Sequence, residues 1–265
     1  MQSGLYIVGT PIGNLSDISP RAIDTLRGVD LIACEDTRVT GKLATHFDIK
    51  TRRIALHEHN ERDIADSLIE KIMGGAAVAL ISDSGMPGIS DPGFRLIRAA
   101  RAAAVPMFVV PGPTALISAL VLSGFPTDRF TFCGFYKDEK RLREDNKIRH
   151  TIIYYESPQR IRATIADMAR VMPERRIAIV REITKIHEET IIGYPYELQD
   201  LKELKGEIVL VVEPAPEVKM SDDDINEIVR DVVRGATGSK SAAAEIAQRT
   251  GIRKSEAYQK VIKNG

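Results

Sequence analysis

The sequence predicts an α/β protein with two α/β domains, a parallel Rossmann-like sheet followed by a mixed sheet, and a small helical C-terminal appendage. Residues 1–127 alternate short apolar runs with helix-length segments, which is typical of a parallel sheet. Residues 128–214 contain more strand and less helix, which favours antiparallel pairs in a mixed domain. The Pro-rich segment 213–220 indicates a linker, and residues 221–265 have the pattern of helices.

The apolar runs and turn signals place the individual elements. In the first domain we expect strands at 4–9, 29–34, 53–56, 76–81 and 106–110, and helices at 21–27, before about 47, at 61–73, 94–104 and 114–122. In the second domain we expect strands at 129–135, 151–155, 176–180, 189–192 and 207–212, a helix beginning near 157–158 and a short helix at 196–201.

Two charged regions have open interpretations. The segment 137–149 mixes six basic with four acidic side chains and is expected to be a solvated connector. In the tail, residues 221–224 are expected to cap one helix, and 241–250 and 255–263 resemble a helix-turn-helix. These tail helices either contact nucleic acid or pack against a neighbouring surface.

Composition excludes several classes of protein. Lys and Arg total 37, as do Asp and Glu, so no overall positive field attracts nucleic acid and RNA binding needs a local patch. Cys34 and Cys133 are distant thiols in apolar runs, and they form neither a disulfide framework nor a zinc site. No apolar run reaches membrane-spanning length, and the chain starts directly with a strand. We therefore expect a cytoplasmic protein with no membrane association.

The segment Ser82 to Gly93, SDSGMPGISDPG, follows a buried strand and precedes a helix. Its three glycines and two prolines let the backbone approach a ligand and hold the loop in shape. Asp91 or Ser90 is expected to cap the next helix, with Pro92 in its first turn. Asp83 is placed to accept a hydrogen bond from a hydroxyl or an ammonium group. An ordinary capped turn is the alternative for this loop alone.

Similar loops follow the other strands. They read TPIGNL, CEDTR, VPGPTAL, YYESP and REITK, and they are expected at the carboxyl ends of strands, where open α/β sheets bind ligands. Neither G-x-G-x-x-G nor G-x-x-x-x-G-K-[ST] is present. His57 and His59 lie two residues apart without an evident third ligand, so we expect no metal site. A cleft between these loops suits a medium-sized organic cofactor without a phosphate chain.

The ordered set of motifs resembles a known family. TPIGNLSDIS, EDTR, LHEHNE, SDSGMPGISDPG, VPGPTA, YESPQR, RE-TK-HEE and KGE fall in the order and spacing of the bacterial 16S rRNA (cytidine-1402) 2′-O-methyltransferases, within the tetrapyrrole methylase superfamily. The resemblance covers about residues 4–214 and continues loosely into the tail. The sequence departs from the family in SDSGMPGIS, where SDAGTPLIS is more frequent, and in a short connector after Phe135.

This resemblance implies that S-adenosylmethionine lies folded between the two domains. The residues expected to bind it are, by position, Ile12, Asp83, Met86, Thr114, Ala115, Tyr155, Ile183 (or Thr184) and Ile208. It also implies methylation of a cytidine ribose in 16S rRNA of the small ribosomal subunit, and a homodimer. The alternatives are a porphyrin or corrin methylase of the same superfamily and a non-catalytic nucleic-acid-binding regulator.

A ribose 2′-hydroxyl is a poor nucleophile, so a positioned base or a stabilising cation would help the reaction. The candidate catalytic residues are Glu182, Lys185 and Glu188 in REITKIHEE, with the pKa of Lys185 expected to be lowered by burial or by a neighbouring cation. A salt-bridged strand edge is the alternative for this segment. The residues expected to contact RNA are Arg38, Lys42, Arg160 and Arg181.

Overall fold

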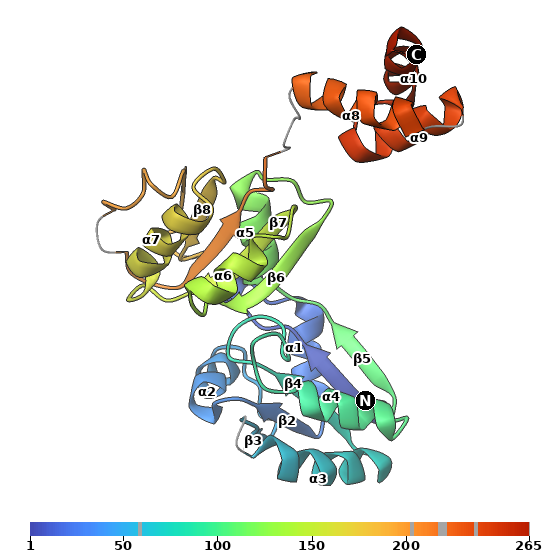
Figure 1. Ribbon diagram of the computed structural model, residues 1–265. Helices are drawn as coiled ribbons and strands as arrows, with labels where there is room; N and C mark the ends of the chain where they lie inside the picture. Colours follow the sequence, from blue (N-terminus) through green and yellow to red (C-terminus); the bar gives the residue numbers. More distant parts are fainter. Residues whose placement is uncertain (58–59, 202–203, 217–221, 236–237, 265) are drawn as a thin grey trace. The chain divides into compact units, whose positions relative to one another are not determined.

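The computed structural model describes residues 1–57, 60–201, 204–216, 222–235 and 238–264. The chain forms two compact units, Met1–Ala215 and Pro216–Gly265. Both sheets belong to the first unit, and three helices form the second (Figure 1). The boundary expected between residues 127 and 128 falls between the two sheets and stays a prediction.

The first sheet is entirely parallel, with strand order β3-β2-β4-β1-β5. Its strands are β1 (Gly4–Val8), β2 (Leu31–Cys34), β3 (Arg53–Ala55), β4 (Ala77–Ile81) and β5 (Met107–Val110). The central strand β4 is buried along its whole length, as expected for an apolar run with helices on both sides. All five strands therefore end at one edge of the sheet.

Helices cover both faces of this sheet. They are α1 (Pro20–Gly28) and α2 (Thr37–His46) on one face, and α3 (Glu61–Met73) and α4 (Phe94–Ala102) on the other. A short 3-10 helix, η1 (Leu15–Asp17), precedes α1. The Ser19 hydroxyl caps α1 by accepting a hydrogen bond from the backbone N–H of Ala22, as the Ser-Pro pair predicts.

The cap expected for α4 is wrong. The N-cap residue is Gly93, with φ 120°, and neither Ser90 nor Asp91 caps the helix. Instead, Glu61 of α3 supplies one buried carboxylate oxygen that accepts hydrogen bonds from three backbone N–H groups, those of Gly93, Arg95 and Leu96, at 3.0, 2.7 and 3.2 Å. A side chain from another helix thus satisfies the free donors at the start of α4.

The second sheet is mixed, with strand order β6-β7-β10-β8-β9. Its strands are β6 (Phe130–Phe135), β7 (Thr151–Glu156), β8 (Ile177–Arg181), β9 (Glu189–Gly193) and β10 (Ile208–Val212). Only β6 and β7 pair in parallel, and the other three pairs are antiparallel. This arrangement confirms the expected fold class.

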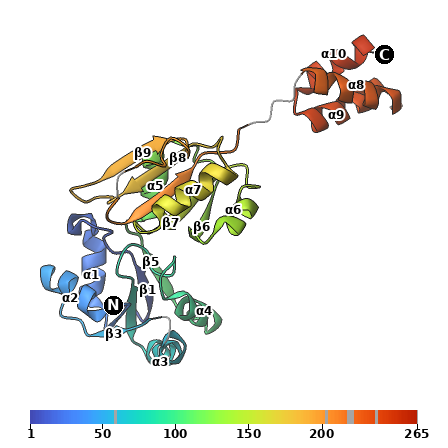
Figure 2. The same ribbon diagram turned by 60° about the vertical axis from the view of Figure 1, so that its left-hand side comes forward.

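Helix α5 (Ala115–Ser123) packs on one face of the second sheet, and α6 (Glu139–Asp145) and α7 (Ile161–Val171) pack on the other (Figure 2). The segment 137–149 is therefore not a solvated connector, since Leu142 and Asp145 of α6 are buried. The short helix expected at 196–201 is absent from the described chain, which forms turns there.

The second unit is a three-helix bundle. It consists of α8 (Asp222–Gly235), α9 (Ser239–Thr250) and α10 (Lys254–Asn264), packed around a core that includes Val229, Ile246 and Ala257. Gly251 ends α9 in the left-handed conformation at φ 76°. The cap expected at Ser221 lies outside the described residues. Within the described part of the chain, no helix is both long enough and apolar enough to cross a membrane.

Candidate active site

A cavity of about 360 Å³ lies where the loops of the first sheet meet the second sheet. Its first wall comes from the loops that follow β1, β4 and β5, represented by Ile12, Met86 and Thr114. The opposite wall comes from the ends of β6 and β7 and the start of β10, represented by Tyr155 and Ile208. The cavity has the size and the largely apolar lining of a small-molecule site.

Glycine contacts shape the first wall. A Cβ atom on Gly9 would lie 2.6 Å from Gly112 Cα, and one on Gly112 would lie 2.8 Å from Gly9 Cα. The loops after β1 and β5 can therefore touch only because both positions lack a side chain. Gly85, at φ 84°, lies between Ile12 and Pro113 in the same wall.

Hydrogen bonds tie the β1 loop to the β4 loop. The Thr10 backbone N–H donates to the Gly85 carbonyl at 2.9 Å, and the buried Thr10 hydroxyl donates to the Ser82 carbonyl at 3.1 Å. Because these contacts are internal to the wall, the loop conformation is set before any ligand binds.

Aromatic side chains build part of the second wall. Tyr155 packs edge-on against Phe132 and Phe135, with ring centroids 4.8 and 5.5 Å apart. Burial raises the pKa of Tyr155, and the backbone of Leu116, in the first turn of α5, opposes that rise. The phenol therefore stays neutral at physiological pH.

Three carboxyl groups line the cavity, those of Asp91, Glu156 and Glu207. Burial, with the nearby charge of Glu35, raises the pKa of Asp91 to about 6, while a hydrogen bond from Ser82 acts in the opposite direction. Glu156, at the end of β7, is 4% exposed and accepts hydrogen bonds from the Thr164 hydroxyl and the Ser157 backbone N–H. Glu156 is thus fixed by α7, whereas Asp91 is ionised mainly above pH 6.

A charged network borders the cavity beside Glu207, which lines it. The Lys185 ammonium donates to Glu182 Oε1 and to Glu207 Oε2, both at 2.9 Å. Burial alone would lower the pKa of Lys185, but these hydrogen bonds outweigh burial and raise it. The expectation of a lowered pKa is therefore wrong, because the neighbours of Lys185 are anions.

Glu182 is held by its surroundings. The hydrogen bond from Lys185 lowers the pKa of Glu182, against the opposing effect of burial. Glu182 has φ 50°, and a Cβ atom on Gly206 would lie 2.2 Å from its Oε1. The Lys185 stem packs on Gly13, whose added Cβ would lie 2.7 Å from Lys185 Cγ. Two glycines therefore make room for the network.

The third candidate catalytic residue has a different environment. Glu188 Oε2 accepts a hydrogen bond from the Thr184 backbone N–H at 2.6 Å, which closes the turn after β8. Thr184 itself has φ 67°, so this contact holds a strained residue in place. Glu188 supports the conformation of the turn that carries Lys185.

The structure brings together most residues predicted to bind the cofactor. The six that line the cavity are Ile12, Met86, Thr114, Ala115, Tyr155 and Ile208. Ile183 lies in the hydrophobic core beneath α5 and does not line it. Asp83 lies on the other side of its loop, where its Oδ1 accepts a hydrogen bond from the Asp36 N–H at 3.2 Å. Its contact with a cofactor stays a prediction that this cavity does not support.

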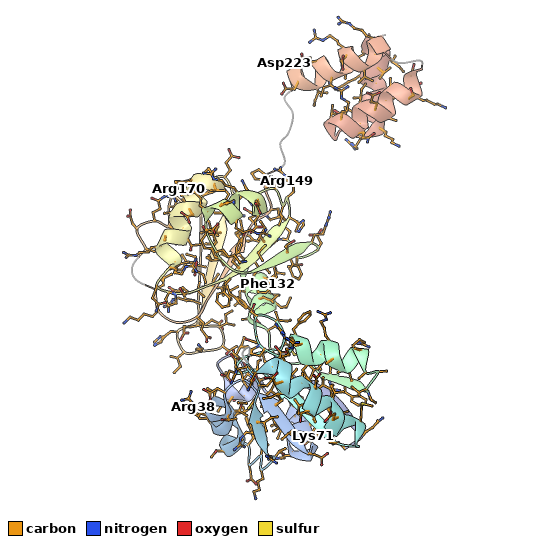
Figure 3. All side chains as sticks on the ribbon, turned by 60° about the horizontal axis from the view of Figure 1, so that its bottom comes forward. Arg38, Lys71, Phe132, Arg149, Arg170 and Asp223 are labelled. Carbon is orange, nitrogen blue, oxygen red and sulfur yellow. The ribbon has the colours of Figure 1, made fainter. Side chains whose placement is uncertain are left out.

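The cations predicted to contact RNA are spread over the first unit. Arg38 projects from the start of α2, 88% exposed, and pairs with Asp36 (Figure 3). Arg160 donates to the Lys137 carbonyl at 2.8 Å, and Arg181 donates to Glu189 at 2.7 Å. Lys42 lines a second cavity, described below. The RNA-binding role of all four stays a prediction.

Sequence reasoning missed several residues of this site. Asp91 is interpreted there only as a helix cap, and Glu207 appears only within the KGE motif. Glu156 stands in YESPQR but has no assigned role. The one available signal is position, because each of these carboxylates follows or precedes a strand at the edge where the loops gather.

Comparison with known proteins defines the class. Residues 4–199 match the family model of the Tetrapyrrole (Corrin/Porphyrin) Methylases, so the chain belongs to that family. A crystal structure of diphthine synthase has TM-score 0.62 at 14% identity, over 79% of this chain and 89% of that one. A uroporphyrin-III C-methyl transferase from Thermus thermophilus complexed with S-adenyl homocysteine has TM-score 0.55 at 18% identity, over 79% and 97%. At these identities the two structures show a shared fold.

Nearer relatives are more specific. The chain is 42% identical to Ribosomal RNA small subunit methyltransferase I of Vibrio cholerae, over 98% of this chain and 94% of the relative. It is 40% identical to the protein of the same name from Escherichia coli O157:H7, over 97% and 94%. Within the tetrapyrrole methylases, its near relatives are thus ribosomal RNA methyltransferases, as the ordered motifs predict.

Proposed function

We propose that the chain transfers a methyl group from S-adenosylmethionine to the ribose 2′-hydroxyl of one cytidine, at position 1402, in 16S rRNA of the small ribosomal subunit. The observation that carries the proposal is a cavity suited to a small-molecule donor, bordered by a lysine held as a cation. The name shared by the 38–47% identical relatives supports ribosomal RNA as the acceptor.

The chemistry of the cavity fits this donor. Ile12, Met86 and Ile208 offer apolar contacts, and Asp91 offers a carboxylate above pH 6. When bound, S-adenosylmethionine supplies a methyl group attached to a positively charged sulfur. A partly desolvated pocket suits this reaction, since the sulfur loses its charge as the methyl group leaves.

The chain's own residues position the acceptor oxygen and stabilise its charge. The new bond joins the ribose oxygen to the methyl carbon, the carbon–sulfur bond breaks, and the hydroxyl proton passes to solvent. We assign Lys185 the role of a cation that stabilises negative charge on the oxygen, because two carboxylates hold its ammonium beside the cavity and keep it charged. Glu182 and Glu207 hold its ammonium, and Glu188 holds its turn.

Arg38 and Lys42 at the first sheet, and Arg160 and Arg181 at the second, are proposed to contact RNA phosphates. A homodimer is proposed from α5, which has no charged residue and exposes Ile117, Val121 and Leu122 by 43, 68 and 41%. Val121→Glu is expected to convert the dimer to a monomer in light scattering. The cytoplasm is the proposed compartment, since ribosomal subunits are the acceptor.

The direct test uses labelled S-adenosylmethionine and small ribosomal subunits from cells that lack this protein. We expect label on one cytidine ribose, located by nuclease mapping and mass spectrometry. Binding of the donor without transfer to ribosomal RNA would contradict the acceptor, and failure to bind the donor would contradict the whole proposal. Transfer to naked 16S rRNA, measured in parallel, tests whether the assembled subunit is required.

A further inference from the structure

We propose that a second cavity, beside the donor cavity, holds the cytosine base of the acceptor nucleotide, and that Asp83 recognises the exocyclic amine of this base. This inference rests on the proposed function. It gives the acceptor a site within the first unit and names a residue that determines base specificity.

The second cavity has a volume of about 300 Å³ and lies at the carboxyl ends of β1, β2 and β4. It shares its walls with the donor cavity. In the β1 loop, Thr10 and Gly13 face the second cavity, while Ile12 faces the first. In the β4 loop, Asp83 faces the second cavity, while Ser84 faces the first.

This alternation puts one layer of backbone between two adjacent sites. Methyl transfer requires the acceptor oxygen to approach the donor carbon to about 3 Å. A nucleotide whose base enters the second cavity extends its ribose toward the boundary between the cavities. The Lys185 stem packs on Gly13 at that boundary. The proposed cation and the proposed base pocket therefore meet at the same loop.

Asp83 has the hydrogen-bonding character that cytosine requires. One of its oxygens accepts from the Asp36 N–H, and the other has no hydrogen bond within the described residues. Cytosine presents an amino donor at position 4, where uracil presents a carbonyl acceptor. A carboxylate therefore attracts cytosine and repels uracil at this point. Burial raises the pKa of Asp83, which is consistent with a partly desolvated group.

Other residues that line the second cavity could contact the faces of a base and the phosphate next to it. Leu15 and Val39 line the cavity although they are 39 and 41% exposed, and flipped bases pack between such apolar side chains. The Thr40 hydroxyl is buried without an oxygen or nitrogen partner in the described chain, next to the weakly bonding Cys34 thiol. Lys42 provides a cation at the rim for a phosphate.

The test compares small subunits that carry either cytidine or uridine at the target position. Wild-type protein is expected to prefer cytidine in kcat/KM, and Asp83→Asn is expected to reduce that preference about 10- to 100-fold. The amide of asparagine can donate to uracil, so uridine transfer by this variant is expected to rise. Its dissociation constant for S-adenosylmethionine is expected to stay within about 3-fold, as Asp83 lies outside the donor cavity.

Asp48→Asn is the matched control, because Asp48 is an exposed aspartate just beyond α2. A second variant, Val39→Glu, alters a cavity-lining position that is 41% exposed. It is expected to abolish methylation of subunits while donor binding persists. Full activity of Val39→Glu would overturn the proposal.

The outcomes separate this inference from the proposed function. If wild-type protein transfers no label to either subunit, the proposed function fails and this inference fails with it. If wild-type protein methylates cytidine but Asp83→Asn keeps the same preference, only the base pocket is overturned. The base pocket is also overturned if wild-type protein methylates cytidine and uridine subunits equally well. It is overturned as well if Asp83→Asn no longer binds the donor, because Asp83 would then belong to the donor site.

Discussion

The two walls of the donor cavity are built by different physical means. The first wall, from the loops after β1, β4 and β5, takes its shape from backbone, with Gly9 touching Gly112 and Gly85 between its neighbours. The second wall, from the second sheet, takes its character from side chains, among them Tyr155 and the network of Glu182, Lys185 and Glu207. Shape therefore comes mainly from the first wall, and most of the charged groups come from the second wall, with Asp91 the exception in the first.

This difference has consequences for substitution. In the backbone wall, an added side-chain atom would push the loops apart. In the side-chain network, a substitution removes one charged group and leaves the others in place. The four changes below test that contrast, from the largest expected effect to the smallest.

Gly112→Ala tests the backbone wall. Its Cβ would lie 2.8 Å from Gly9 Cα, so the two loops must separate. We expect a loss of about 3 kcal/mol in the free energy of unfolding and donor binding too weak to measure. Urea unfolding measures the loss of stability, and titration calorimetry measures donor binding. Gly41→Ala in α2 is the control, as nothing lies within 4 Å of its added Cβ, and it should not destabilise the protein.

Lys185→Met tests the side-chain wall. We expect kcat to fall about 100-fold, because the transition state loses a cation, while the donor dissociation constant changes little. The raised pKa also predicts a rate that stays level between about pH 7 and 9. A rate that rises tenfold per pH unit in that range would instead make Lys185 a base. Lys205→Met, at an exposed neighbouring position, is the control.

Glu61→Ala tests the cap that holds the start of α4, the helix that follows the β4 loop of the backbone wall. Three N–H donors at the start of α4 lose their acceptor. We expect a loss of about 2 kcal/mol in the free energy of unfolding, measured in urea. Glu70→Ala, on the exposed side of the same helix, should change it by less than about 0.5 kcal/mol. Equal losses in the two variants would contradict the role of Glu61 as a cap.

Asp91 is a carboxyl group within the backbone wall, and it should show the smallest effect. With its pKa near 6, it is neutral at pH 5 and ionised at pH 7.5. Affinity for the cationic donor should therefore increase with pH, by about tenfold, which corresponds to one pKa unit of coupling. In Asp91→Asn this increase should disappear, whereas Asp128→Asn, at an exposed site, should keep it. Binding titrations from pH 5 to 7.5 check this.

The same contrast explains how much the sequence could predict. Glycine and proline loops after apolar runs leave a local signal, so the loops of the first wall were predictable, and the family resemblance then pointed to Ile12, Met86 and Thr114 within them. The order of the strands and the family motifs likewise predicted the α/β fold. The side-chain network left a weaker signal, because the pKa of Lys185 is raised by Glu182, three residues away, and also by Glu207, 22 residues away, and no local pattern shows that the second carboxylate is there.

The errors share that cause. Glu61 caps a helix that starts more than thirty residues later, and no local pattern at Ser90 or Asp91 reveals it. Leu142 is buried in α6, although the many charged residues of this segment predicted a solvated connector. The position of Asp83 is a separate case, because it lies in the predicted loop but lines the second cavity, so its contact with a cofactor stays a prediction.

The cap from Glu61 also sets an order of events during folding. The start of α4 has no side-chain cap of its own, so this helix end forms only once α3 has docked on the sheet. Contacts between distant segments cost loop-closure entropy and form late. Helix α3 leaves the ribosome before α4, so its carboxylate is already available when the later segment emerges. The order of the loop that shapes the donor cavity therefore depends on the docking of α3.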